Sequence, residues 1–152
     1  MPTKRASEAD ETVNDCFCLQ SRMTARAITR QYNAALAPVG LEITEFSLLA
    51  ALATIKGESI ADLAEQLAFE RTTLVRNLKR LEDRGLVRQT GAGGRAVWYA
   101  LTSDGQTLFR RAAPHWRRAQ ATVRRALAKG NGKADAVLGA LEALRHAAGK
   151  SS

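Results

Sequence analysis

The side chains best suited to binding another molecule lie on one face of a helix that the sequence predicts over residues 71–84. Leu74, Leu78 and Leu81 recur in it at helical spacing and predict an apolar inner face. An advance of about 100° per residue places hydroxyl and cationic side chains on the opposite face. Such side chains donate hydrogen bonds to phosphate oxygens and base edges. The sequence therefore predicts a DNA-reading helix with these contact residues: Arg71, Thr72, Thr73, Arg76, Asn77, Lys79 and Arg80.

A predicted hairpin follows this helix directly. Gly85 ends the helix, a strand-like run covers 86–90, and the glycine-rich turn 91–94 leads through Arg95 into a second run over 96–101. A basic helix followed by a hairpin with an arginine at its tip is typical of a recognition helix and its wing. Arg95 is therefore another candidate DNA contact. The alternative is a solvated amphipathic surface helix, but the hairpin and the threonines and arginines of the first turns favour DNA.

A second short helix precedes the basic one. Ser59 and Asp62 form a capping-box-like start for a helix that continues through Leu67, after a predicted turn over 56–58. Two short helices joined by a brief connection, the second of them basic, are the organisation of a helix-turn-helix.

Longer helices are predicted on both sides of this unit. Residues 13–36 favour a first helix that ends before Pro38 and Gly40, and Thr44 can cap a second helix over 45–54.

Downstream of the hairpin, Thr102 is expected to cap a long helix over about 103–128, and 134–147 form the last helix. The long helix carries arginines at seven-residue intervals, which predict either an exposed ridge or added contacts with DNA backbone or a partner subunit's acids. They are Arg110, Arg117 and Arg124, and Arg111, Arg118 and Arg125.

The charge of the chain indicates an anionic partner. Its 152 residues carry a net charge of +8 and a pI near 10.2, which favours nucleic acid first and a membrane surface second. No run approaches the roughly 18 apolar residues of a membrane span, and the first ten residues lack the apolar core of a signal peptide. A cytoplasmic protein without membrane contact is expected. The ionised residues from 42 to 70 are nearly all acidic, whereas arginine dominates from Arg71 onward.

Catalytic chemistry finds little support in the sequence. The only histidines, His115 and His146, stand neither beside a nucleophile nor at a metal-ligand spacing. The glycines of 91–94 suit a hairpin turn rather than a phosphate-binding loop. We therefore expect no enzymatic activity, no catalytic or metal-binding residues and no cofactor.

These motifs in this order resemble the MarR family of winged helix-turn-helix transcription regulators. The similarity covers nearly all of 16–147 and is most specific in four segments: 59–64, 71–78, 81–87 and 101–105. It implies a mainly α (α+β) fold, a winged helix-turn-helix with N- and C-terminal dimerisation helices. The implied organisation is a flexible N-terminus over 1–12 and a single domain over 13–148, with a DNA-binding core at about 44–102 and dimerisation helices at about 13–37 and 103–148.

The resemblance also implies partners. The family's regulators are homodimers that read the major groove with the helix that begins here at Arg71 and enter the minor groove with the wing arginine, here Arg95. One departure concerns that wing, because Gly93 stands where the family usually carries an acid.

The two cysteines allow two interpretations. Cys16 and Cys18 would point to nearly opposite sides of a helix and could not bridge without unwinding it. By resemblance to the family's organic-hydroperoxide-sensing branch, Cys18 stands at the reactive cysteine and Tyr32 at one of its partner tyrosines, while Arg22 and Ile43 replace the other two. Arg22, one turn after Cys18, could lower the pKa of its thiol. The alternative is that Cys18 packs as a small hydrophobe and a small molecule, often an aromatic acid in this family, is the effector.

The sequence thus predicts a DNA-binding transcription regulator, a repressor that binds a pseudo-palindromic, inverted-repeat operator on double-stranded DNA as a homodimer and is released by a small-molecule effector. One alternative is a peroxide-sensing repressor of the same fold that uses the Cys18 thiol. Another is a winged-helix protein-interaction module that does not bind DNA.

Overall fold

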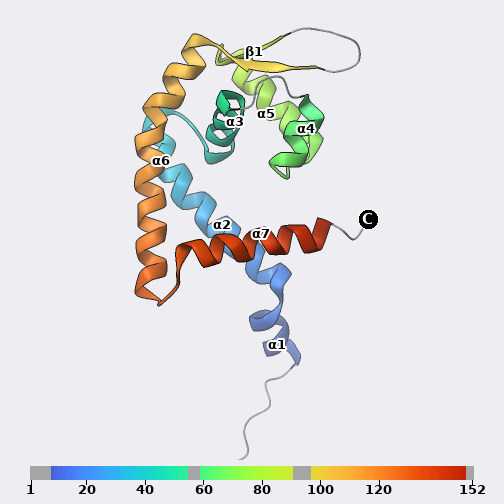
Figure 1. The fold of residues 1–152 in the computed structure, drawn as a ribbon, viewed down its shortest axis with the longest axis vertical. Helices are drawn as coiled ribbons and strands as arrows, with labels where there is room; N and C mark the ends of the chain where they lie inside the picture. Colours follow the sequence, from blue (N-terminus) through green and yellow to red (C-terminus); the bar gives the residue numbers. More distant parts are fainter. Residues whose placement is uncertain (1–7, 55–58, 91–96, 150–152) are drawn as a thin grey trace, which may run out of the picture.

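The helices and strands gather at two ends of an elongated molecule. The computed structural model describes residues 8–54, 59–90 and 97–149. The elements are α1 (Glu8–Asp15), α2 (Phe17–Leu36), the 3-10 turn η1 (Ala37–Val39), α3 (Ile43–Thr54), α4 (Ile60–Gln66), α5 (Arg71–Asp83), β1 (Val87–Gln89), β2 (Tyr99–Leu101), α6 (Ser103–Lys129) and α7 (Ala134–Gly149). Figure 1 shows α3, α4, α5 and the strands at one end, with α6 running from there to α7, which crosses α2.

The core lies where α3 packs against α2, α5, α6 and the strands. It is built mainly from leucines, which are good helix formers and bury large apolar side chains. Phe46 of α3 stacks on Phe109 and Trp116 of α6, with ring centroids 5.3 and 6.0 Å apart. The completely buried leucines are Leu36, Leu48, Leu49, Leu63, Leu74, Leu78 and Leu81.

The predicted hairpin forms directly after α5. Gly85 ends that helix in the left-handed conformation, with φ of 70°, which glycine adopts without steric cost. The strands pair antiparallel with Val87 opposite Leu101, and a bridge between Ser59 and Trp98 ties the hairpin to the start of α4. The strands are shorter than predicted. The predicted turns at 56–58 and 91–94, and Arg95, lie outside the described residues.

Two predicted helix caps are confirmed. At α4, the Ser59 hydroxyl accepts from the Asp62 amide while the Asp62 carboxylate accepts from the Ser59 amide. The hydrogen bonds from Ser59 lower the pKa of the Asp62 carboxyl below its usual value. At α6, the Thr102 hydroxyl accepts from the Gly105 amide at 3.0 Å. Each cap satisfies amides that have no partner inside the helix.

The predicted first helix is wrong at two points. Its N-terminal part begins earlier, at Glu8, and the helix breaks at Cys16, whose backbone is extended with ψ of 107°. Asn14 and Asp15 precede the break, and such side chains compete with the helix for backbone hydrogen bonds. The side chain of Gln20 donates to the Val13 carbonyl across the break at 2.7 Å.

The predicted start of the second helix is also wrong. Helix α3 begins at Ile43, so Thr44 lies inside it and is not its cap. The Asn33 side-chain carbonyl accepts from the Ile43 amide at 2.7 Å, and the Glu45 carboxylate accepts from the Glu42 amide at 3.1 Å. A residue of α2 therefore caps α3, which local sequence could not indicate.

No single helix in the described part of the chain is long and apolar enough to cross a membrane. Among the described residues, only the pair Phe17–Val39 and Ile43–Thr54 together has the length and composition of a membrane span. The axes of these two segments are bent by 75° relative to each other.

Gly105 sets how closely α6 approaches the end of α5. A β-carbon at this position would lie 2.0 Å from the carbonyl oxygen of Leu86, far inside van der Waals contact. The same oxygen accepts from the Thr102 amide at 3.1 Å. Glycine is therefore needed for the first turn of α6 to pack on the backbone that joins α5 to β1.

Gly105→Ala is expected to lower the free energy of unfolding by about 1–3 kcal/mol, because overpacking forces neighbouring backbone apart. Urea unfolding monitored by circular dichroism measures the change. Gln106→Ala, at an exposed position in the same helical turn, serves as the control and should change stability little. An unchanged midpoint for Gly105→Ala would contradict the close contact.

Candidate nucleic-acid interface

Helix α5 divides into an apolar inner face and an exposed face that carries donors. Leu74, Leu78 and Leu81 are completely buried and hold the helix against the core. Thr73, near the start of the helix, is half-buried. The structure brings most of the predicted contact residues together on the exposed face, together with Val75, which the sequence analysis did not single out. The exposed residues are Arg71, Thr72, Val75, Arg76, Lys79, Arg80 and the acid Asp83 at the end of the helix.

Asn77 does not belong to the exposed face. It is only 7% exposed and lies on the inner side of α5, three residues after Leu74 and four before Leu81. The prediction that placed Asn77 among the DNA contacts was wrong about its position. Helical geometry explains the burial, because residues three and four apart share a face.

Lys79 is held by acids of its own helix. Its ammonium group lies 2.7 Å from Asp83 Oδ1 and 3.9 Å from Glu82 Oε2. The hydrogen bond to Asp83 raises the pKa of Lys79 above its usual value. All three side chains reach solvent, and exposed pairs of this kind contribute little to stability. Lys79 can therefore exchange its carboxylate partner for a phosphate at small cost.

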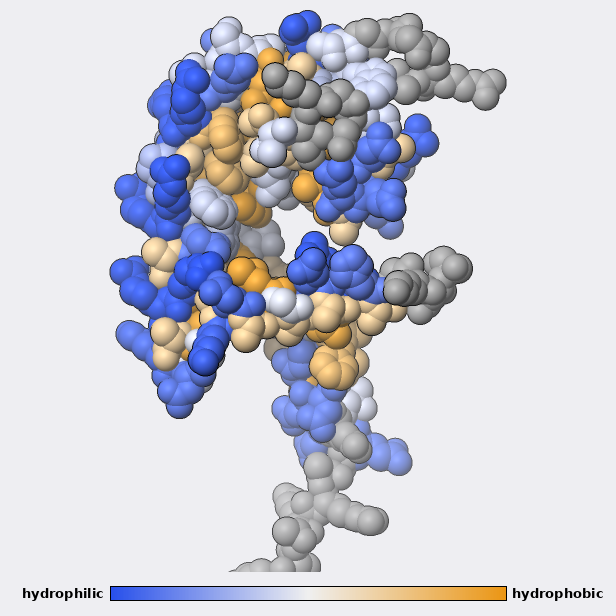
Figure 2. Space-filling model, viewed as in Figure 1, coloured by the Kyte–Doolittle hydropathy of each residue, from blue (hydrophilic) through white to orange (hydrophobic). Residues whose placement is uncertain are grey.

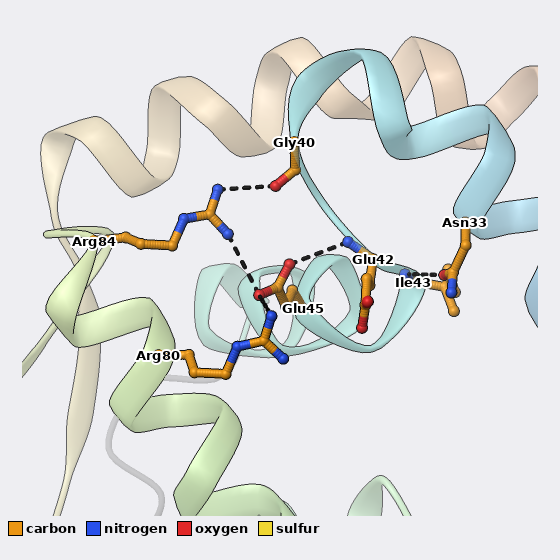
Figure 3. A network of polar contacts seen from close by, with 7 residues as sticks. All are labelled: Asn33, Gly40, Glu42, Ile43, Glu45, Arg80 and Arg84. Carbon is orange, nitrogen blue, oxygen red and sulfur yellow. Dashed lines mark hydrogen bonds and ion pairs between the residues drawn. The ribbon is translucent and has the colours of Figure 1, made fainter.

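A buried carboxylate joins the second half of α5 to the turn between α2 and α3 (Figure 3). The Glu45 side chain, 3% exposed, has its Oε1 atom 3.3 Å from Arg84 Nη1 and 3.6 Å from Arg80 Nη2. Its Oε2 atom accepts from the Glu42 amide. Arg84 also donates from Nη2 to the Gly40 carbonyl at 2.9 Å. Both oxygens of this carboxylate thus have partners, as burial of a charge requires.

Glu45 and Arg84 were missed as positioning residues in the sequence analysis. The available signal was the concentration of acids before Arg71 and of arginines after it. Which acid meets which arginine depends on the fold, because Glu45 and Arg84 are 39 positions apart. Arg80, which was predicted as a DNA contact, is exposed and also forms an ion pair with Glu45.

The wing is described only at its base. Arg88 of β1 is exposed, and the Gln89 side chain donates to the Tyr99 hydroxyl across the strands at 3.1 Å. Arg95 lies outside the described residues, so its part in DNA binding stays a prediction.

Sequence comparison assigns the chain to a family. A profile described as the MarR family matches residues 39–96. The HTH-type transcriptional repressor Rv2887 of Mycobacterium tuberculosis is 35% identical over 95 residues, which cover 61% of this chain and 68% of that protein. This chain belongs to the MarR family of transcriptional regulators.

Solved structures extend the similarity over most of this MarR-family chain. The Mycobacterium tuberculosis regulator MosR in complex with DNA has a TM-score of 0.79 and 36% identity, covering 88% of this chain and 96% of MosR. The repressor CouR bound to a 23-mer DNA duplex has a TM-score of 0.77 and 24% identity, covering 91% and 99%. CouR has also been solved with p-coumaroyl-CoA. The predicted mainly α fold with a winged helix-turn-helix is confirmed.

The cysteines of this MarR-family protein lie far from α5, around the start of α2. Cys18 is exposed, and Cys16 is the half-buried residue at the helix break, so the premise that both lie in one continuous helix was wrong. Tyr32 is fourteen positions after Cys18 on α2, or about 21 Å along the axis, and cannot touch it within one chain. The Tyr32 hydroxyl instead bonds to Gln120 Oε1, and burial raises its pKa while Arg124 partly offsets this.

The six arginines of α6 are all exposed. Arg124 pairs with Asp135 of α7 at 3.2 Å. No group of His, Cys, Asp and Glu side chains among the described residues could hold a metal ion.

The Glu45 cluster generates a stability prediction. Arg84→Met keeps the length of the side chain but removes the charge, leaving the buried carboxylate with fewer partners. The free energy of unfolding should fall by roughly 1–3 kcal/mol, the cost of leaving a buried polar group incompletely paired. Urea unfolding is the measurement.

Arg88→Met is the matched control, since Arg88 is exposed on β1. If both substitutions change stability equally, Glu45 does not depend on Arg84.

Proposed function

We propose that this protein is a transcriptional repressor that binds an inverted-repeat operator on double-stranded DNA as a homodimer. The observation that carries the proposal is the exposed face of α5, where Arg71, Thr72, Arg76 and Lys79 lie together beside the hairpin. Support also comes from MosR and CouR, which share the fold and have been solved on DNA. A regulator of this kind works in the cytoplasm and needs no catalytic activity.

Each side chain of the exposed face has a chemical role in this proposal. Arg71, Thr72 and Thr73 lie in the first turn of α5, where free amides and the helix dipole favour a phosphate. Arg76 lies one turn further on, and a guanidinium group there can bind both acceptors of a guanine in the major groove. Lys79 and Arg80 are phosphate contacts. Arg95 is proposed as the minor-groove contact of the wing.

A second copy of the chain is proposed to cover α7 and the first half of α2. None of the α7 residues from 134 to 148 is buried within the chain, although three of its leucines form an apolar stripe: Leu138, Leu141 and Leu144. Figure 2 shows these apolar colours along α7 and at its crossing with α2. Phe17 and Met23 of α2 are exposed as well. Large exposed apolar patches mark protein interfaces, so these helices are the proposed dimer contact.

The effector is proposed to bind between α3 and α6. A shallow, open pocket of about 400 Å³ lies there, within the size range of small-molecule sites. Phe46, Ala51, Leu67 and Trp116 line it with apolar surface, and Thr54 adds a hydroxyl. A small molecule with an aromatic group fits this lining, and the related fold of CouR holds p-coumaroyl-CoA.

A salt titration tests whether the exposed face of α5 binds DNA. Phosphate contacts release counterions, so the affinity for a duplex selected from a random pool should fall on the order of 10³-fold or more between 50 and 200 mM salt. Arg76→Ala should cost about 1–3 kcal/mol and relax the preference at one base pair in each half-site. Lys79→Ala should weaken all duplexes alike and flatten the salt dependence.

Equal, sequence-independent losses for both variants would reduce Arg76 to a phosphate contact. Binding that is absent or indifferent to salt would favour a protein-interaction module instead.

A thiol switch is the second candidate function, favoured by the exposure of Cys18 close to the proposed dimer contact. In this mechanism the Cys18 thiolate attacks an organic hydroperoxide, forming a sulfenic acid and releasing an alcohol. Arg22, also exposed and one turn further along α2, is the nearest candidate cation on that helix. Because Tyr32 is out of reach within one chain, a tyrosine partner would have to come from the second subunit.

Treatment with an organic hydroperoxide separates the thiol switch from a ligand switch. If Cys18 is the sensor, the oxidised protein loses affinity for its operator in a gel-shift assay, and Cys18→Ser does not respond. Cys16→Ser is the control and should respond as the wild type does. Full affinity of the oxidised wild type would leave the open pocket between α3 and α6 as the effector site.

A further inference from the structure

Val75 is an exposed apolar side chain at the edge of the polar face of α5. Its side chain is 44% exposed, although valine is both apolar and a weaker helix former than leucine or alanine. On α5, Val75 lies between the buried Leu78, three residues further on, and the exposed polar face. Its other neighbours at helical spacing are Arg71, Thr72 and Lys79, and Arg76 follows it directly. All four of these are exposed donors.

The core does not explain this valine. The inner face of α5 is already formed by Leu74, Leu78 and Leu81, which are completely buried. Val75 keeps 44% of its side chain exposed beside that face. A single exposed valine elsewhere on a surface would need no explanation. Here it lies at the edge of the surface proposed to enter the major groove.

The major groove offers only one apolar group to such a side chain. Base edges present hydrogen-bond donors and acceptors there, together with the C5-methyl group of thymine. Arginine, threonine and lysine can bond to the polar groups and to phosphates, but valine cannot. A buried contact between valine and a polar base edge would leave that edge without a partner, which is costly.

We propose that Val75 is a specificity-determining residue that packs on a thymine C5-methyl group in each half-site of the operator. The inference rests on the proposed DNA binding by α5. It adds that thymine is preferred over cytosine and uracil at one position per half-site, and that the preference comes from apolar contact rather than from hydrogen bonding.

Deoxyuridine substitution tests this contact, since uracil lacks the methyl group but keeps every hydrogen-bonding atom of thymine. Each thymine of the selected operator is replaced in turn, in both half-sites at once, and affinity is measured by gel shift. Burial of one methyl group corresponds to about fourfold in affinity, so the paired replacement should weaken the wild type on the order of tenfold at one position.

Val75→Ala should bind the thymine and uracil duplexes equally at that position. The variant should fold, since Val75 is 44% exposed and alanine favours helix. Thr72→Ser is the matched control, because it removes a methyl group from the same face and keeps the hydroxyl. It should keep the wild-type response to uracil.

A wild type that binds a specific operator but ignores every uracil would overturn the role of Val75 and leave the proposed function intact. A uracil response that persists in Val75→Ala, or disappears in Thr72→Ser instead, would also overturn it. Failure to bind any duplex specifically would remove both proposals.

Discussion

The buried carboxylate of Glu45 is the contact on which the placement of the recognition helix depends. It lies on α3 and meets Arg80 of α5 and Arg84, the residue that follows α5, while Arg84 also donates to the carbonyl of Gly40, the residue that follows η1. Leucine packing fixes the distance between α3 and α5 but not their relative orientation, because apolar contact has little directionality. Two guanidinium groups on one carboxylate add an orientation. The direction of α5 is thus tied to the turn that joins α2 to α3, and α2 is a proposed dimerisation helix.

This arrangement gives the DNA-binding end of the molecule a physical link to its other end. Helix α6 makes a second connection, because its first turn packs on the Leu86 backbone while its aromatic residues stack on Phe46. A ligand between α3 and α6 would lie against the same aromatic cluster. We propose that ligand binding there alters the spacing of the two recognition helices in the dimer, on which DNA affinity depends because half-sites repeat with the helical turn.

Local chemistry explains which parts of this fold were predictable. The Ser59 and Thr102 caps, the Gly85 helix end and the leucine face of α5 each depend on neighbours within a few residues, and the structure confirms them. The start of α3 depends on Asn33 of α2, ten positions before Ile43. The break at Cys16 follows Asn14 and Asp15, which the spacing of apolar residues does not reveal. Asn77 was misplaced because its residue type suggested a base contact, whereas its angle on the helix places it beside the leucines. Glu45 required knowledge of a contact over 39 positions.

The central claim is that two copies of α5, held at a fixed spacing by a dimer, present their exposed faces to DNA. Selection of bound duplexes from a random pool, followed by sequencing, tests it most directly. The account predicts an inverted repeat whose half-sites are centred about one helical turn, roughly 10 base pairs, apart or a multiple of it. A direct repeat, a single half-site or a pool without any enriched sequence would contradict it.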